Sequence, residues 1–176
     1  MGDLSDQMLA RRWQLDPRRS SVEFRVRHFW GLRTIKGHFD EYEGRLELGA
    51  DPAIELTVDP ATVQTGNRQR DKHLRSPDFF DVESDWPVRF VSDSVEVHDQ
   101  TLTVRGKLFA RDQSIPLELN AEVSEADGEL AIKASATAPH RELGMTYSPL
   151  GMIMGSSELL VNGYLVPAAG PRNGSA

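Results

Sequence analysis

The chain has 176 residues, enough for one domain with a sizeable core, and 39% of them are hydrophobic. Its formal net charge of −7 argues against a nucleic-acid partner, because such proteins usually present a basic patch to the phosphate backbone. The one basic cluster, which is interrupted by an aspartate, consists of Arg68, Arg70, Lys72 and Arg75. The sequence has no cysteine, which excludes disulfides, thiol nucleophiles and thiolate metal sites.

The N-terminal segment lacks the features of a secretory signal. Residues 1–10 carry Asp3 and Asp6 and have neither a basic flank nor an apolar stretch. No run in the chain approaches the roughly 18 apolar residues of a membrane span. We therefore predict a soluble, cytoplasmic protein that does not insert stably into a membrane.

Apolar and polar residues alternate along eight segments of the chain, as expected for β-strands with one buried face. In chain order these segments are 22–28, 35–39, 45–48, 54–58, 102–108, 117–123, 130–137 and 159–165. Strands of this kind are typically antiparallel and cover a single core. The pattern breaks between Gln64 and Trp86, where the sequence predicts a short helix over Asn67–Leu74 and then a loop that carries Phe79 and Phe80.

Eight alternating segments with almost no helix leave two architectures, a β-sandwich or a β-barrel. Several inward positions have small side chains, namely Gly37, Gly106, Ala121, Ala134, Ala136 and Gly163. A barrel of about eight strands that is lined partly by small residues can enclose one ligand, although small residues also occur at bulges and bends. The sequence therefore favours an all-β, antiparallel, eight-stranded barrel with a short helical excursion.

A series of motifs in a fixed order resembles the YceI-like family of lipid-binding proteins. The motifs are Trp13–Pro17, Ser20–His28, Ile35–Phe39, Thr65–Val82, Trp86–Phe90, Val104–Leu108 and Leu143–Met145. The most specific is Arg-Asp-x-His-Leu followed by Asp-Phe-Phe-Asp-Val. Two features depart from the family: many relatives are exported, and the segment Phe109–Ser114 is unusually polar. We do not transfer a periplasmic carrier role, and we assign no function to that segment.

The resemblance implies an extended, lipocalin-like barrel over residues 13–167, with an N-terminal extension over 1–12. The Gly-, Pro-, Asn- and Ser-rich residues 168–176 are typical of a disordered tail. The resemblance also implies a long apolar tunnel for a polyisoprenoid chain, such as an isoprenoid quinone or its precursor. Family members often pair, so a homodimer is a further expectation.

We expect ten apolar residues to line this tunnel, the alternative for each being an ordinary core position. They are Phe24, Val26, Phe39, Leu56, Leu74, Phe79, Phe80, Phe90, Leu108 and Met145. Burial alone would bind the lipid, because each buried methylene contributes at most about 0.8 kcal/mol. No reaction is needed for such binding.

Four polar residues are further candidates. Arg70 and His73 can donate hydrogen bonds to a quinone or phenol oxygen of the ligand. Alternatively, Asp71 pairs with an arginine or caps the loop and so fixes the excursion over the barrel, and we favour this structural role. His28 lies on the apolar face of its segment, either as a satisfied core histidine, which we favour, or as a polar group inside the tunnel.

The sequence contains no recognisable catalytic, cofactor or metal motif. Its five histidines are scattered singly, and Asp71-x-His73 alone is poor support for a metal site. We favour a binding protein that stores, shields or carries an isoprenoid lipid without catalysis and without a cofactor. Two alternatives stay open: an enzyme that acts on such a lipid, with His73 or His28 as acid–base and Asp71 orienting it, and a barrel filled by its own side chains.

Overall fold

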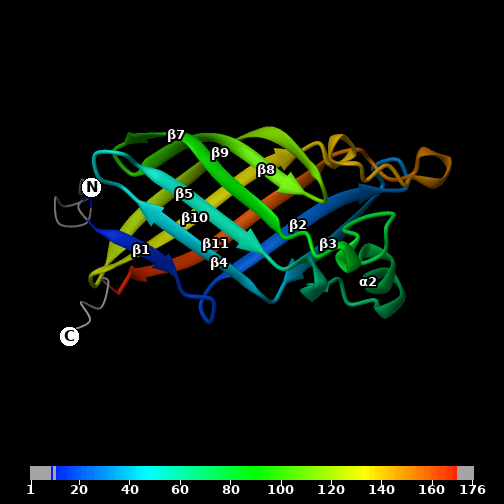
Figure 1. Cartoon of the computed structure of the whole chain (residues 1–176), viewed down its shortest axis with the longest axis horizontal. Coiled ribbons are helices and arrows are strands. Elements are labelled where there is room, and N and C mark those ends of the chain that lie inside the picture. The colour runs from blue at the N-terminus through cyan, green and yellow to red at the C-terminus, as the bar shows by residue number, and fades with distance from the viewer. Residues whose placement is uncertain (1–8, 10, 170–176) are drawn as a thin grey trace.

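The computed structural model describes residue 9 and residues 11–169 of the chain. Most of the predicted N-terminal extension, and the predicted tail from residue 170 onward, therefore lie outside the described residues. Within the described range the chain forms a sheet of eleven strands and one α-helix (Figure 1). The strands are β1 (Arg12–Leu15), β2 (Ser21–His28), β3 (Arg33–Phe39), β4 (Tyr42–Glu47), β5 (Ala53–Val58), β6 (Val63–Gln64), β7 (Val88–His98), β8 (Thr101–Ala110), β9 (Gln113–Ala126), β10 (Glu129–Ala138) and β11 (Ser157–Pro167).

The helix and four short 3-10 turns lie between these strands. The helix α2 is Arg68–Leu74, and Asn67 caps its N-terminus by accepting a hydrogen bond from the backbone N–H of Arg70 at 3.0 Å. The 3-10 turns are Pro60–Thr62, Val82–Ser84, His140–Leu143 and Pro149–Gly151. Within the described part of the chain, no helix has the length and apolar character needed to span a membrane.

Eight of the strands close into a ring. Hydrogen bonds connect them in the order β1-β4-β5-β7-β8-β9-β10-β11, and β11 pairs in turn with β1. Every neighbouring pair in the ring is antiparallel. The structure thus confirms the predicted all-β, antiparallel, eight-stranded barrel with a helical excursion.

The ring continues at one end as a three-stranded extension. The end of β11, Leu165–Pro167, pairs with β1, whereas its beginning, Ser157–Asn162, pairs with β2. Strand β2 pairs with β3, and β3 pairs with the two-residue β6. The sheet order ends at β6, so no backbone ladder joins β6 to β7. Figure 1 shows α2 and the segment that follows it at this end of the barrel.

One long strand, β7, was not predicted from the alternation of side chains. Its polar run Ser92-Asp93-Ser94 interrupts the period of two, and its pairing with β8 shifts register between Ser92 and Ser94. A bulge of this kind places two residues opposite one on the partner strand, so inward and outward positions no longer alternate in sequence. The strands β1 and β6 have only four and two residues and were also not predicted.

The core lies inside the ring and is built from inward side chains of most of its strands. The largest of the almost completely buried side chains are Trp13, Leu46, Val63, Leu102, Val104, Val123 and Leu130. Along β8, buried positions alternate with more exposed ones, which is the pattern that the sequence predicted for a strand with one face inward.

The inward glycines do not leave the empty space that we expected from the sequence. A Cβ at position 37 would overlap Cζ of Phe24, and a Cβ at position 106 would lie 2.8 Å from Cζ of Phe90. At position 163, an added Cβ would overlap a side-chain carbon of Leu15. These glycines instead accommodate large neighbouring side chains, so the inference of a cavity from them was wrong.

Gly106→Ala should therefore destabilise the protein. The added Cβ would collide with the backbone carbonyl oxygen of Val91 as well as with Phe90, and the backbone cannot move away without disturbing the β7–β8 ladder. We expect a loss of about 1–3 kcal/mol in the free energy of unfolding, measured by urea denaturation. Gly49→Ala is the control, because its Cβ would meet nothing nearer than 3.6 Å. Equal stabilities of the two variants would contradict this account of Gly106.

Candidate functional site

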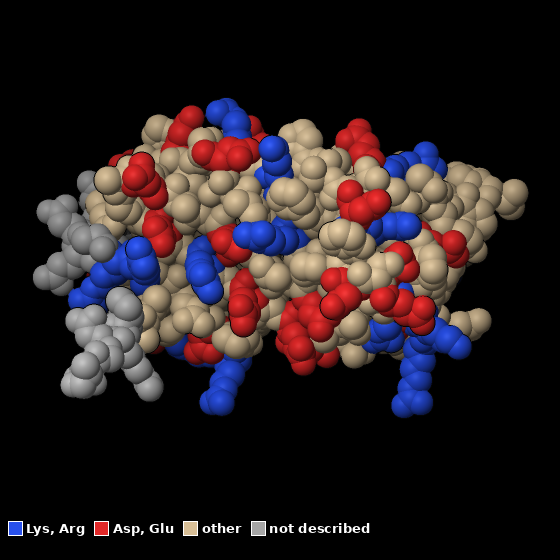
Figure 2. All heavy atoms as spheres, in the orientation of Figure 1, with Lys and Arg blue, Asp and Glu red and all other residues tan. Residues whose placement is uncertain are grey.

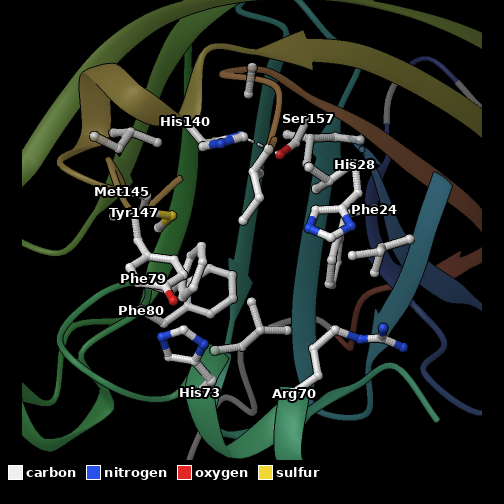
Figure 3. A pocket seen from close by; sticks show the side chains of 18 of the residues that line it. Phe24, His28, Arg70, His73, Phe79, Phe80, His140, Met145, Tyr147 and Ser157 are labelled. Atoms are coloured by element: carbon white, nitrogen blue, oxygen red, sulfur yellow. Dashed lines mark hydrogen bonds between the residues drawn. The ribbon is translucent and has the colours of Figure 1, made fainter. Parts of the chain in front are cut away.

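A cavity of about 810 Å³ opens at the end of the barrel where the sheet is incomplete. Strands β2 and β3 form one wall, α2 with Phe79 and Phe80 forms another, and the segment 138–159 contributes a third (Figure 3). Most of the lining side chains are apolar. The volume lies within the range of about 300–1,000 Å³ that is usual for sites that bury a small molecule.

A second apolar space lies next to the cavity, among side chains of the ring strands. This smaller pocket of about 130 Å³ shares four lining residues with the cavity, namely Phe39, Val88, Leu108 and Leu159. Ala134 and Ala136, two of the small inward residues noted in the sequence, line this inner pocket. The two spaces are therefore neighbours, both mostly apolar, and the larger one lies at the α2 end.

All thirteen residues predicted for the site line one of these two spaces. Those on the larger cavity are Phe24, Val26, His28, Phe39, Arg70, His73, Leu74, Phe79, Phe80, Leu108 and Met145. Leu56 and Phe90 line only the inner pocket. The structure thus brings the predicted residues together in space, while their contact with a ligand stays a prediction.

A buried carboxylate fixes α2 over the opening. Asp71 is only 5% exposed, and its Oδ1 accepts hydrogen bonds from the backbone N–H of Thr65 at 2.9 Å and from the Thr65 hydroxyl at 2.5 Å. Arg70 donates from Nε to Thr65 Oγ1 at 2.8 Å and from a terminal nitrogen to the Thr65 carbonyl at 3.1 Å. Both side chains thus tie the helix to the end of β6, and Asp71 does so through Thr65 rather than by pairing with an arginine.

Two further arginines hold the segment that follows α2. Arg75 donates to two backbone carbonyls of the segment 61–63, at 2.7 and 3.0 Å. Arg111, in the turn between β8 and β9, donates to the carbonyls of Phe79 and Gly144, both at 3.1 Å. The polar segment to which the sequence gave no function therefore joins the α2 side of the opening to the loop after β10.

An aromatic cluster forms a second connection across the opening. The rings of His73 and Tyr147 are 4.6 Å apart between centroids and nearly perpendicular, and Phe79 contacts both rings (Figure 3). His73 Nε2 lies 2.7 Å from Oδ2 of Asp78. The carboxylate next to the His73 ring is therefore that of Asp78, and Asp71 is engaged separately by Thr65.

A second histidine, His28, lies at the edge of the same cavity. It is half-buried, lines the cavity, and its ring contacts Phe29 at a centroid distance of 4.2 Å. This position corresponds to a polar group that faces the interior space rather than to a histidine enclosed in the core. In the part of the chain that the structure describes, no group of three or more His, Asp or Glu side chains is arranged to hold a metal ion.

The sequence analysis missed a buried polar pair in the cavity wall. His140 and Ser157 are 8% and 9% exposed, and His140 Nδ1 lies 2.7 Å from Ser157 Oγ (Figure 3). They are 17 positions apart in the sequence, and the β10–β11 pairing brings them together because Ala138 lies opposite Ser157. Only the register of this pairing would have revealed the pair from sequence.

The environment of His140 favours a neutral imidazole. Burial, and to a lesser degree the positive charge of Arg141, lower the pKa of His140 below its usual value of 6.5. Among residues 9 and 11–169, every side-chain nitrogen or oxygen that is fully enclosed has a hydrogen-bond partner. His140 Nε2 has no such partner there, so it is not fully enclosed. Nε2 therefore keeps accessible surface, and His140 can offer it to a molecule in the cavity that it lines.

The fold and the cavity together define a lipocalin-like protein, a closed antiparallel barrel with an apolar interior that opens at one end. The sequence profile of the YceI-like domain matches residues 13–162, and the chain belongs to this family. This finding confirms the family that the sequence motifs indicated.

Proteins of known sequence support this assignment. A UPF0312 protein of Vibrio cholerae is 34% identical over 110 residues, which are 58% of this chain and 57% of the relative. The chain thus spans a little over half the length of that relative. A UPF0312 protein of Pseudomonas aeruginosa is 26% identical over 152 residues, with 80% of this chain and 78% of the relative covered.

Solved structures show the same fold at low sequence identity. The crystal structure of Burkholderia cenocepacia BcnA has a TM-score of 0.78 and 13% identity, and the match covers 85% of this chain and 98% of that one. A polyisoprenoid-binding domain from Saccharophagus degradans has a TM-score of 0.70 and 14% identity, with 91% of this chain and 99% of that one covered. At such identities the likeness concerns the fold.

The lowered pKa of His140 predicts a pH dependence of stability. The unfolded chain binds a proton at His140 near pH 6.5, whereas the folded chain does so only at lower pH. As the pH falls from about 7.5 to about 5, wild-type protein should therefore lose stability that His140→Gln does not lose. Urea denaturation across this range would measure the difference. His98→Gln, which replaces an exposed histidine, is the control, and parallel profiles for all three proteins would contradict the prediction.

Proposed function

We propose that the protein binds a long apolar isoprenoid-type lipid, a polyisoprenoid or an isoprenoid quinone or its precursor, for storage, shielding or transport and without catalysis. The observation that carries this proposal is the mostly apolar cavity of about 810 Å³, which shares four lining residues with a second apolar pocket of the ring. The polyisoprenoid-binding domain of Saccharophagus degradans, which shares the fold, adds support.

The shape of the interior suits a linear lipid with one polar end. Polar side chains gather around the larger cavity, including Arg70, His73, His28 and the His140–Ser157 pair, whereas the inner pocket is lined mainly by aliphatic residues. The tail would lie in the inner pocket and the head near the opening. Each buried methylene contributes up to about 0.8 kcal/mol, so a few isoprene units are enough for micromolar affinity after the costs of association.

The buried His140–Ser157 pair is the best-placed partner for a polar head. If His140 Nδ1 accepts a hydrogen bond from the Ser157 hydroxyl, Nε2 carries the ring hydrogen and can donate a hydrogen bond to a quinone carbonyl. If Nδ1 donates to Ser157 instead, Nε2 can accept from a phenol or quinol hydroxyl. Arg70 is less suited to this role than the sequence suggested, because Thr65 already engages two of its nitrogens.

The geometry gives less support to the enzyme hypothesis. Asp71 would have to orient His73 as an acid–base, but Asp71 binds Thr65 and His73 contacts Asp78. Turnover of a bound lipid that is lost in both His73→Ala and His28→Ala would revive the hypothesis.

The cytoplasmic location, the homodimer and the absence of a nucleic-acid partner stay predictions.

Identification of the bound lipid is the direct test of the proposal. Purified protein would be extracted with organic solvent before and after incubation with prenyl quinones of different chain length, and the extracts analysed by mass spectrometry. We expect stoichiometric recovery of an isoprenoid lipid after incubation. Extracts that repeatedly contain none would refute the proposal.

Ala134→Phe should shorten the chain that the barrel accepts. Ala134 lines the inner pocket, and a phenyl ring there would occupy the space proposed for the tail. We expect capture of long-chain prenyl quinones to fall about tenfold while short-chain ones bind as before, because one or two methylenes lose their burial. Ala131→Phe is the matched control, since it lies on the same strand with its side chain on the other face. Equal losses for both chain lengths would contradict the assignment of the inner pocket.

Ser157→Ala should separate binding of the head from binding of the tail. Loss of the hydroxyl leaves His140 without its partner, so a prenyl quinone should bind about five- to tenfold more weakly, whereas the hydrocarbon squalene should bind unchanged. Competition against a fluorescent fatty probe would measure both affinities. Ser156→Ala, its exposed neighbour, is the control. Equal weakening for both lipids would assign the pair a purely structural role.

A further inference from the structure

The end of the barrel that carries the opening presents an exposed apolar surface. Two loops form it, the turn between β2 and β3 and the loop before β11. We call this surface the apolar rim, and its exposed side chains are Phe29, Trp30, Leu32, Tyr147, Leu150 and Met154. Leu32 and Leu150 are each 84% exposed and Trp30 is 62% exposed, so nothing in the described chain covers them.

The backbone holds the two loops of the rim together. The N–H of Trp30 donates to the Met152 carbonyl at 3.2 Å, and the N–H of Met154 donates to the Arg27 carbonyl at 3.0 Å. Phe29, Trp30 and Leu150 have positive φ angles of 50°, 51° and 53°, an uncommon conformation for large residues. The loops thus form one surface, in which large apolar residues are held in a backbone conformation that carries an energetic cost.

The rim adjoins the opening of the cavity. Phe29 and Tyr147 belong both to the rim and to the cavity lining, and Ile153 lines the cavity from the same loop. Trp30, Leu32, Leu150 and Met154 are exposed and are not among the lining residues. Apolar side chains are therefore found both on the outer surface of the rim and in the adjoining wall of the cavity.

The two strands that lead to the rim carry cations without ion pairs, although the chain as a whole is acidic, and Arg33 stacks on the ring of Phe29 at 5.5 Å. Residues 24–37 contain Arg25, Arg27, Arg33 and Lys36 and no acidic residue, and residues 144–157 contain no charged residue at all. None of these four cations forms an ion pair with a described residue, whereas Arg19 and Arg105 elsewhere on the barrel do. In Figure 2 the outermost atoms of the right-hand end, where the loops protrude, are tan and so belong to residues other than Lys, Arg, Asp and Glu.

We propose that the apolar rim docks on the surface of a lipid bilayer with anionic headgroups and places the opening of the cavity against it. Exposed Trp and aliphatic side chains flanked by arginine and lysine are the composition that partitions into a bilayer interface. A second copy of the chain is less well matched, because two apposed rims would bring their unpaired cations together. This inference rests on the proposed function, since the bilayer would supply or receive the isoprenoid lipid.

Vesicle binding tests the docking surface. Purified full-length protein would be sedimented with vesicles of phosphatidylcholine, with or without about one third phosphatidylglycerol. We expect binding to the anionic vesicles that falls at least about tenfold in the double variant Trp30→Ser, Leu150→Ser and in Arg27→Gln, Arg33→Gln. Trp86→Ser is the matched control, because Trp86 is 47% exposed and lies outside the rim. Equal binding of wild type and both double variants would overturn the proposal.

Lipid loading separates this proposal from the proposed function. When a prenyl quinone is delivered from ethanol, the variant Trp30→Ser, Leu150→Ser should capture as much as wild type, because neither residue lines the cavity. Its uptake from anionic vesicles should be at least about tenfold slower. Capture by neither protein would refute the lipid-binding function and leave vesicle binding to be judged by sedimentation. A change of oligomeric state in the variant, with vesicle binding intact, would assign the rim to self-association instead.

Discussion

The buried carboxylate of Asp71 holds together the part of the molecule where the barrel is incomplete. The sheet order ends at β6, so at this end the apolar interior has to be covered by α2 and the segment that follows it. Two hydrogen bonds from Thr65 to Asp71 fix that cover, and Arg70 completes the network on the same residue. A buried carboxylate is costly unless its oxygens are satisfied, so this network specifies one position for the helix. The cavity exists because the cover is tied down without filling the space beneath it.

The two ends of the barrel differ because the ring closes fully at only one of them. At the β1 end, Trp13 pairs with both β4 and β11 and is almost completely buried. At the other end, β2 and β3 extend beyond the ring, and their turn carries exposed apolar side chains. The two ends of the interior therefore differ in polarity. The inner pocket is apolar, whereas polar groups lie near the opening. A lipid with one polar end would match this difference, with its tail in the inner pocket and its head near the opening.

The sequence predicted what depends on local patterns and missed what depends on pairing between distant segments. Alternation revealed most strands because one face of each meets a single core, and the break in that alternation placed a short helix at 67–74, close to the observed α2. Strand β7 escaped because its bulge breaks the alternation, and the glycines misled because only the structure shows that Phe24 fills the space above Gly37. Part of the apolar lining followed from the predicted strand faces, as at Phe24, Phe39 and Leu108. The His140–Ser157 pair did not, because the β10–β11 register that brings it together is not visible in a local pattern.

The residues that hold α2 and the segment after it in place differ from those that these elements present to the cavity. The cover is held by polar bonds, from Thr65 to Asp71 and from Arg75 and Arg111 to backbone carbonyls, while Leu74, Phe79 and Phe80 face the cavity. An apolar ligand offers no hydrogen bonds that could replace these, so the cover can stay in place whether the cavity is empty or filled. By contrast, the two loops of the apolar rim are joined by backbone hydrogen bonds at Trp30 and Met154. For the proposed lipid, entry is therefore best placed at the rim, where exposed apolar side chains adjoin the lining of the cavity.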